Sequence, residues 1–336
     1  MSRRYLVTGA NGCIGAWIVK ILLDRDDHVT TFDLGTEQHR LDALLDPERI
    51  GQVRSTINEI TGDVSNPDDV RKAVEAAEPD AIIHLAGLQV PTCRKDPLTG
   101  ARVNVTGTLN IFEAARDAGI SNVTYASSAA VYGPAPADHA VKEHEHVDPR
   151  THYGVFKRAN EGNAEVYWND HGLPSAGLRP LTVYGLGRDQ GMTSAPTSAM
   201  KSVLLGEPFT MPLIGATDFL YVEDAALAFI TCADEIREGA HVFNIAGEST
   251  TFERCIDLID EALPEDRRGL ISCNGGEIPI APCLDDSALR SATSHACRTS
   301  LKDGIGRTLA DFNRLLGENR LDLRDLPELV GKSGGS

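Results

Sequence analysis

A tyrosine and a lysine near the middle of the chain have the spacing of a proton-transfer pair. Tyr153 and Lys157 are four residues apart, so on a helix their side chains project from the same face. A nearby ammonium group favours the phenolate and lowers the pKa of the tyrosine. Such a tyrosine can take the proton from a secondary alcohol while a hydride leaves the carbon. The pair predicts chemistry on a carbon–oxygen bond, with Tyr153 as the acid/base and Lys157 tuning it.

A hydroxyl-rich segment strengthens this prediction. It reads Ser127-Ser128-Ala129-Ala130-Val131-Tyr132-Gly133, and Ser128 precedes Tyr153 by 25 residues. Tyr-x-x-x-Lys occurs often by chance as a surface pair, but a serine hydroxyl at a strand end could hydrogen-bond the same substrate oxygen as the tyrosine. The sequence therefore predicts a catalytic set of Ser128, Tyr153 and Lys157.

Near the N-terminus, three glycines form a GxxGxxG loop between a predicted strand and a predicted helix: Gly9, Gly12 and Gly15. Glycines at this spacing allow a tight turn and bring backbone amides against a pyrophosphate at the helix N-terminus. Asp33 ends the next predicted strand, where an acid accepts both ribose hydroxyls and repels a 2′-phosphate. The sequence therefore predicts NAD as cofactor. NADP is disfavoured rather than excluded, because the basic residues His39 and Arg40 follow closely after Asp33.

The order of the elements predicts the fold. Short β-rich runs alternate with segments of helical periodicity, as expected for an α/β, Rossmann-type doubly wound parallel sheet. The predicted strands are 5–8, 29–33, 56–61, 81–85, 123–127 and 175–178. Further predictions are a loop over a site at 185–198, a returning strand at 242–245, and helices at 222–233, 252–263 and 301–316.

These elements suggest a division into lobes. We expect an NAD-binding Rossmann domain at 1–184, to which 221–246 returns. A smaller C-terminal substrate-binding lobe would comprise 185–220 and 247–330, and a disordered tail 331–336.

Composition excludes several classes of function. The chain has 336 residues, a net charge of −17 and no basic run, so we expect neither nucleic-acid nor acidic-membrane partners. No apolar run approaches the roughly 18 residues of a membrane helix, and no signal peptide is evident, so we expect a cytoplasmic protein. Seven cysteines without a CxxC, and histidines that match no ligand spacing, predict free thiols and no metal site.

The motifs together resemble the extended short-chain dehydrogenases/reductases, the NAD-dependent epimerase/dehydratase family. The resemblance covers nearly the whole chain and rests on the glycine loop, Gly62-Asp63-Val64, His84-Leu85-Ala86-Gly87, Asn104, Ser128 to Gly133, Tyr153/Lys157, Leu178-Arg179-Pro180, and Thr299-Ser300-Leu301 to Phe312. It implies a homodimer formed through helices spanning 97–118 and 153–170.

The resemblance also implies roles for individual residues. Asp63 and Val64 would lie near adenine, Asn104 would support the cofactor, and Lys157 would also hold the nicotinamide ribose. The full cofactor set expected is Gly9, Gly12, Cys13, Ile14, Gly15, Asp33, Asp63, Val64, Leu85, Ala86, Gly87, Asn104, Tyr153, Lys157, Pro180 and Val183. The substrate set expected is Gln89, Ser128, Thr182, Arg188 and Tyr221.

Three departures from the family pattern bear on the reaction. Dehydratases of the family carry an acidic pair where this chain has Ala129 and Ala130, so we exclude water elimination. Thr182 stands where an Asn commonly contacts nucleotide-sugar phosphates, and Thr217 where an Arg grips a phosphate. Each lost charge-assisted contact would cost roughly 1.5–3 kcal/mol, which weakens the nucleotide-sugar interpretation without removing it.

A different anchor is available in Arg188, which could bind a carboxylate of a smaller polyhydroxy substrate; the alternative is a solvated arginine paired with Asp189. We expect hydride transfer at a secondary hydroxyl of a sugar or sugar-acid-like substrate, with net dehydrogenation slightly favoured. A nucleotide-sugar 4-epimerase acting through a keto intermediate is the alternative. A catalytically silent dinucleotide-binding sensor or scaffold is a third possibility, disfavoured because Ser128, Tyr153 and Lys157 are all present.

Overall fold

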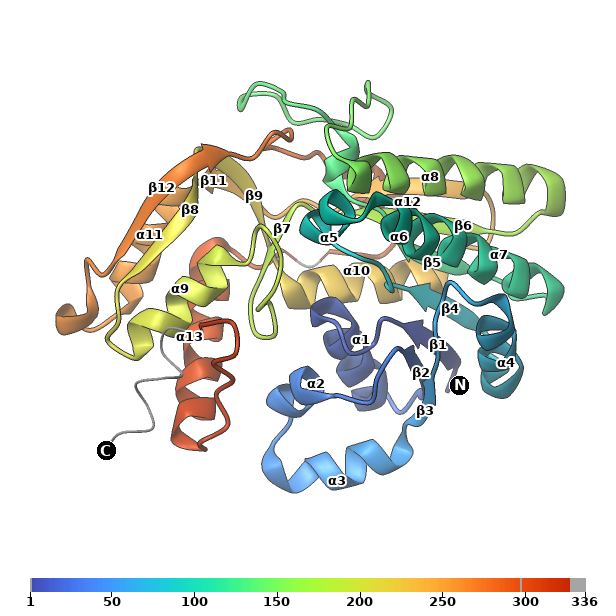
Figure 1. Ribbon diagram of the computed structural model, residues 1–336, viewed down its shortest axis with the longest axis horizontal. Coiled ribbons are helices and arrows are strands. Elements are labelled where there is room, and N and C mark those ends of the chain that lie inside the picture. The colour runs from blue at the N-terminus through green and yellow to red at the C-terminus, as the bar shows by residue number, and fades with distance from the viewer. Residues whose placement is uncertain (1, 297, 327–336) are drawn as a thin grey trace.

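The computed structural model describes residues 2–296 and 298–326, and a seven-stranded sheet forms its centre (Figure 1). The strands lie in the order β10-β6-β5-β4-β1-β2-β3, and every neighbouring pair is parallel. Their bounds are β1 (Arg4–Thr8), β2 (His28–Asp33), β3 (Asn58–Thr61), β4 (Ala81–His84), β5 (Val123–Ala126), β6 (Ser175–Arg179) and β10 (Ala240–Asn244). The Rossmann-type doubly wound sheet predicted from the sequence is confirmed.

Most predicted strands agree with the structure to within one residue at each end. The strand expected at 56–61 begins two residues later, at Asn58, because Thr56 ends helix α3 (Pro47–Thr56). The strand expected at 242–245 is β10, which pairs with β6 at the edge of the sheet.

Helices cover both faces of the sheet, and alternation along β1 shows why. Tyr5 and Val7 belong to the core cluster that includes α1 (Cys13–Asp24) and α10 (Val222–Glu235). Leu6, between them, points to the opposite cluster, with α4 (Pro67–Ala77), α7 (Gly107–Asp117) and α8 (His152–His171). A strand with apolar residues on both faces must be buried on both, as parallel sheets require.

The second half of the chain contributes two small sheets beside the large one (Figure 1). One joins β7 (Thr182–Tyr184), β9 (Ala216–Tyr221) and β11 (Glu248–Thr251); the other pairs β8 (Phe209–Ile214) with β12 (Ile271–Glu277). The helices packed here are α9 (Ala195–Leu204), α11 (Phe252–Ala262) and α13 (Leu301–Gly317). The helices predicted at 222–233, 252–263 and 301–316 are confirmed, whereas the loop predicted at 185–198 is wrong at its end, where α9 begins.

The remaining helices are short: α2 (His39–Leu44), α5 (Val90–Lys95), α6 (Pro97–Ala101), α12 (Ser287–Ala292), a π turn at Arg102–Thr106, and 3-10 turns at Ala129–Val131 and Glu265–Arg267. Within the described residues, no helix combines the length and apolarity needed to cross a bilayer. The six cysteines described are free thiols; Cys297 and the expected tail 331–336 lie outside the described residues. The division into lobes stays a prediction.

Candidate active site

A cavity of about 440 Å³ runs along the carboxyl-terminal edge of the central sheet. Residues that follow β1, β2, β4 and β5 line it, which is where open α/β sheets bind ligands. Most residues predicted for the site lie in its wall: Gly9, Gly12, Cys13, Ile14, Gly15, Asp33, Asp63, Val64, Leu85, Ala86, Gly87, Gln89, Ser128, Tyr153, Lys157, Pro180, Val183 and Arg188. The structure does not bring Asn104, Thr182 or Tyr221 to this wall.

The glycine loop has the geometry of a phosphate cradle. Gly9 has φ +67°, and a Cβ there would lie 2.6 Å from the amide nitrogen of Ala86. A Cβ on Gly15 would lie 2.3 Å from the carbonyl oxygen of Gly9. Helix α1 begins after Gly12 with no side-chain cap, so its first amides keep free donors toward the cavity. These donors at a helix N-terminus fit the pyrophosphate of NAD.

Asp33 lies at the far end of the same cavity, at the end of β2. Its Oδ2 accepts a hydrogen bond from the amide of Asn11 (2.9 Å), and its Oδ1 accepts one from the amide of Leu34 (2.8 Å). A carboxylate is an acceptor only, so these contacts fix its position while leaving lone pairs for ribose hydroxyls. The arrangement fits the adenosine end of NAD.

The three predicted catalytic residues meet at the opposite end. Ser128 caps the 3-10 turn after β5, and its Oγ accepts from the amide of Ala130 (3.1 Å). Tyr153 and Lys157 lie in the first turns of α8, and the Lys157 Nζ is 5.4 Å from the centre of the tyrosine ring. That Nζ donates to the backbone oxygen of Ala126 (2.7 Å). The lysine is thereby fixed to the strand end that carries the serine.

The electrostatics of the pair differ from the sequence-based expectation. Burial raises the pKa of Tyr153, and a hydrogen bond with Ser128 and the charge of Arg188 oppose that rise. The pKa of Tyr153 is therefore raised and not lowered as the sequence predicted, because burial outweighs the opposing contributions of Ser128 and Arg188. Burial also lowers the pKa of Lys157 to about 8, despite opposing contributions from Cys93 and Glu161.

A buried ion pair supports the site from behind. Arg179, at the end of β6, donates through Nε and Nη2 to both carboxylate oxygens of Glu161 (2.7 and 2.8 Å). Glu161, one turn after Lys157, also accepts from the Ser127 hydroxyl (2.6 Å). Arg179 further donates to the Tyr132 hydroxyl (2.5 Å). The network ties α8 to the segments on both sides of Ser128.

Asn104 supports the cavity without lining it. It lies in the π turn between α6 and α7, a feature often found at functional sites. Its side chain accepts from the amide of Leu88 (2.7 Å) and donates to the carbonyl of the same residue (2.9 Å). Asn104 therefore fixes the wall that follows β4.

Two other predicted substrate residues are buried elsewhere. The hydroxyls of Thr182 and Thr217 hydrogen-bond each other at 2.7 Å, and both residues are 0% exposed. Tyr221 is 2% exposed and packs edge-on against Trp17. The two threonines that replace the family's phosphate-contacting residues thus satisfy one another.

Arg188 is not paired with Asp189. Its Nη2 donates to Thr193 Oγ1 (3.1 Å), and its buried Nε has no hydrogen-bond partner among the described residues. A Cβ on Gly191, whose φ is +104°, would lie 2.0 Å from Gln89 Oε1 and 3.1 Å from Arg188 Nη2. The glycine therefore allows the glutamine and arginine side chains to share one corner of the cavity.

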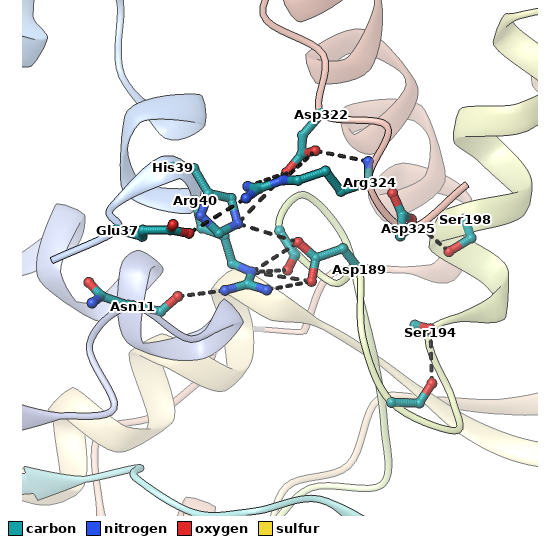
Figure 2. Close-up of polar contacts among 12 residues, drawn as sticks. Asn11, Glu37, His39, Arg40, Asp189, Ser194, Ser198, Asp322, Arg324 and Asp325 are labelled. Atoms are coloured by element: carbon teal, nitrogen blue, oxygen red, sulfur yellow. Dashed lines mark hydrogen bonds and ion pairs between the residues drawn. The ribbon is translucent and has the colours of Figure 1, made fainter. Parts of the chain in front are cut away.

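Asp189 instead binds Arg40, a contact that no sequence motif indicated. Figure 2 shows the guanidinium of Arg40 between Asp189 and the backbone of Asn11. His39, Asp189 and Asp322 have side-chain atoms within 4.8 Å of one another, a spacing that could hold a metal. Both carboxylates are already engaged, Asp189 by Arg40 and Asp322 by Arg324.

Comparison with known proteins agrees with this geometry. A sequence model of the NAD dependent epimerase/dehydratase family matches residues 5–246. An uncharacterised protein of Methanocaldococcus jannaschii is 34% identical over 229 residues, 66% of this chain and 69% of that protein. A UDP-glucose 4-epimerase of Mycolicibacterium smegmatis is 27% identical over 319 residues, 92% of this chain and 98% of that protein. The crystal structure of a UDP-glucose 4-epimerase of Thermus thermophilus with NAD superposes with a TM-score of 0.77 and 25% identity, covering 92% of this chain and 99% of that one.

We predict that Gly154→Ala damages the catalytic end of the cavity. The new Cβ would lie 2.2 Å from the backbone oxygen of Ala130, so α8 must move away from the serine-bearing turn. We expect a loss of about 1–3 kcal/mol in the free energy of unfolding and about a 100-fold fall in kcat. Urea unfolding and the rate of NADH formation measure these effects. Gly306→Ala, at an exposed position of α13 with open space around it, should leave the rate unchanged and stabilise the fold by about 0.5–1 kcal/mol, as alanine does in a helix interior. A loss of rate and stability equal to that of Gly154→Ala would contradict the prediction.

A second prediction concerns pH. Between about pH 8 and about pH 10 the folded Lys157 is neutral while the unfolded lysine is protonated. The unfolded state then binds more protons, so stability rises with pH. Relative to Lys157→Met, the wild type should gain roughly 1–3 kcal/mol of unfolding free energy across this range. Urea titrations at several pH values measure the difference, and Lys72→Met, at an exposed lysine, serves as the control. A difference that does not vary with pH would show that Lys157 keeps an ordinary pKa.

Proposed function

Because the chain belongs to the NAD-dependent epimerase/dehydratase family, we propose that it transfers a hydride between NAD and a secondary hydroxyl of a sugar or sugar-acid-like substrate. Enzymes of this family are NAD-dependent, and the cavity described above fits that cofactor along its length. Asp33 would hold the adenosine ribose, the glycine loop the pyrophosphate, and Lys157 the nicotinamide ribose. The division into an NAD-binding domain and a smaller substrate lobe belongs to the same proposal.

The chain's own residues move the proton. Bound NAD supplies the hydride acceptor. Tyr153 removes the hydroxyl proton, and Ser128 orients the same oxygen by a hydrogen bond. Lys157, charged below about pH 8, stabilises the phenolate as it forms, and the Ala126 carbonyl fixes the direction of its ammonium group.

We propose an anionic substrate because the guanidinium of Arg188 has no acidic partner among the described residues. It lies close enough to Tyr153 to oppose the rise of the tyrosine pKa, and its buried Nε lacks a partner among the described residues. A buried donor without a partner costs roughly 1–3 kcal/mol, which a substrate carboxylate would recover. Among the described residues that line the cavity, the other two cations are Arg40, which is paired with Asp189, and Lys157, which donates to the Ala126 carbonyl and is assigned to the nicotinamide ribose. A single guanidinium with an unused donor suits one carboxylate better than a diphosphate.

The buried threonine pair supports net dehydrogenation of such a substrate. Thr182 and Thr217 satisfy one another and leave no group for a nucleotide phosphate at those positions. The second candidate function is nucleotide-sugar 4-epimerisation. Its support is the similarity over 92% of this chain to proteins named UDP-glucose 4-epimerase.

Incubation with NAD and two substrate panels tests the proposal. We expect stoichiometric NADH with a free sugar acid, and Arg188→Ala should raise KM for that substrate by about 10- to 100-fold, because a charge-assisted bond is lost. NADH accumulation is followed at its absorbance maximum, with Tyr153→Phe as the inactive control. Conversion of a nucleotide sugar to its isomer without NADH would establish the epimerase instead. A biological role that survives Tyr153→Phe intact would favour the silent sensor.

We also propose a homodimer through α6 and α8. Among the described residues, three large apolar side chains on these helices are exposed: Leu98 by 77%, Val155 by 47% and Val166 by 55%. Leu98→Glu combined with Val166→Glu should place two charges in the interface and yield monomers in size-exclusion chromatography with light scattering. Leu316→Glu, at an exposed leucine on α13, is the control. A monomeric wild type would refute the proposal.

A further inference from the structure

Arg40 stands where an arginine could recognise NADP. It lies in α2, seven residues after Asp33, and lines the same cavity. An arginine near the end of the second strand can accommodate the 2′-phosphate that distinguishes NADP from NAD. Its presence beside an NAD-type aspartate therefore needs an explanation.

The guanidinium of Arg40 is already bound. Its Nε donates to Asp189 Oδ2 (3.0 Å) and to the Gly187 carbonyl (3.1 Å), and its Nη2 donates to Asp189 Oδ1 (2.6 Å). Its Nη1 donates to the Asn11 carbonyl (2.7 Å). The two charged side chains are only 13% and 14% exposed. A bidentate arginine–carboxylate pair is stronger than hydrogen bonds between neutral groups, and its low exposure reduces screening by water.

Asp189 is held in place from its own side of the cavity. It belongs to the loop between β7 and α9, 149 residues after Arg40. The indole of Trp17, in α1, donates to the Leu186 carbonyl (3.0 Å) and fixes this loop to the nucleotide-binding lobe. A Cβ added to Gly187, whose φ is +90°, would lie 3.6 Å from Arg40 Cδ. The loop thus presents its carboxylate to Arg40 in a fixed position.

The charges at this end of the cavity leave a net negative site. The backbone of Asn11 links the two acidic groups, because its amide donates to Asp33 and its carbonyl accepts from Arg40. Asp33 and Asp189 carry two negative charges against the single positive charge of Arg40. A further phosphate dianion would meet repulsion here.

We propose that Asp189 contributes to the selection of NAD over NADP by sequestering Arg40, which among the described residues of the cavity is the cation nearest in sequence to Asp33. The carboxylate comes from the loop that also carries Arg188, so a residue of the substrate side sets the preference at the cofactor side. The inference concerns cofactor choice and does not depend on which substrate is turned over.

Calorimetric titration of nucleotide-free protein with NAD and with NADP tests the proposal. Asp189→Asn should release Arg40 and shift the ratio of the two Kd values toward NADP by about tenfold or more, because a charge-assisted contact to phosphate becomes available. The Kd for NAD should change much less. In the double variant Asp189→Asn/Arg40→Ala the shift should disappear.

Two further variants keep the test decisive. Asp322→Asn removes the neighbouring carboxylate, which pairs with Arg324 rather than Arg40, and should leave the ratio unchanged. Arg40→Ala alone leaves Asp189 without its cation and makes the site more negative, so it should not shift the ratio toward NADP. The proposal is overturned if Asp189→Asn binds NAD normally with an unaltered ratio. It is equally overturned if Asp189→Asn/Arg40→Ala keeps the full shift of Asp189→Asn, since the loss of a negative charge would then explain the shift without Arg40.

Discussion

The buried ion pair between Arg179 and Glu161 is the constraint on which the arrangement of Ser128, Tyr153 and Lys157 depends. Two charges removed from water cost several kcal/mol each unless their partners are well placed, so the pair tolerates little displacement. The arginine belongs to a strand end and the glutamate to α8, one turn after Lys157. Both also bond side chains that flank Ser128 in sequence, Ser127 and Tyr132. Proper pairing therefore requires the serine turn and the Tyr153 helix to meet in one arrangement.

This rigidity explains how the fold keeps a poorly solvated ammonium group at its centre. Burial lowers the pKa of Lys157, so keeping this side chain charged destabilises the folded state. The Ala126 carbonyl and the negative charge of Glu161 recover part of that cost. Glu161 thus acts twice, once by fixing α8 to the sheet and once by favouring the charged lysine. An unfavourable burial of a charged group is expected at a functional site, where function competes with stability.

The sequence was informative wherever a feature is local. The glycine loop, Asp33 and the Tyr153/Lys157 pair each depend on neighbours within about one element, and the structure brings them to one cavity. The short strands β7 and β11 escaped prediction because segments of three or four residues show too little periodicity. Thr182 is buried against the Thr217 hydroxyl instead of lining the cavity, and the sequence could not show this because the two residues are 35 positions apart. The Arg40–Asp189 contact spans 149 residues and carries no sequence signal at all.

Adjacent residues of one loop therefore serve opposite ends of the cavity. Arg188 shares a corner with Gln89 near Tyr153, while Asp189 turns toward Arg40 and the glycine loop. Consecutive Cα atoms are about 3.8 Å apart across a trans peptide, so a backbone movement at one residue shifts the position of the other. Under the roles proposed above, the loop after β7 carries both a substrate contact, Arg188, and a contact that affects cofactor choice, Asp189.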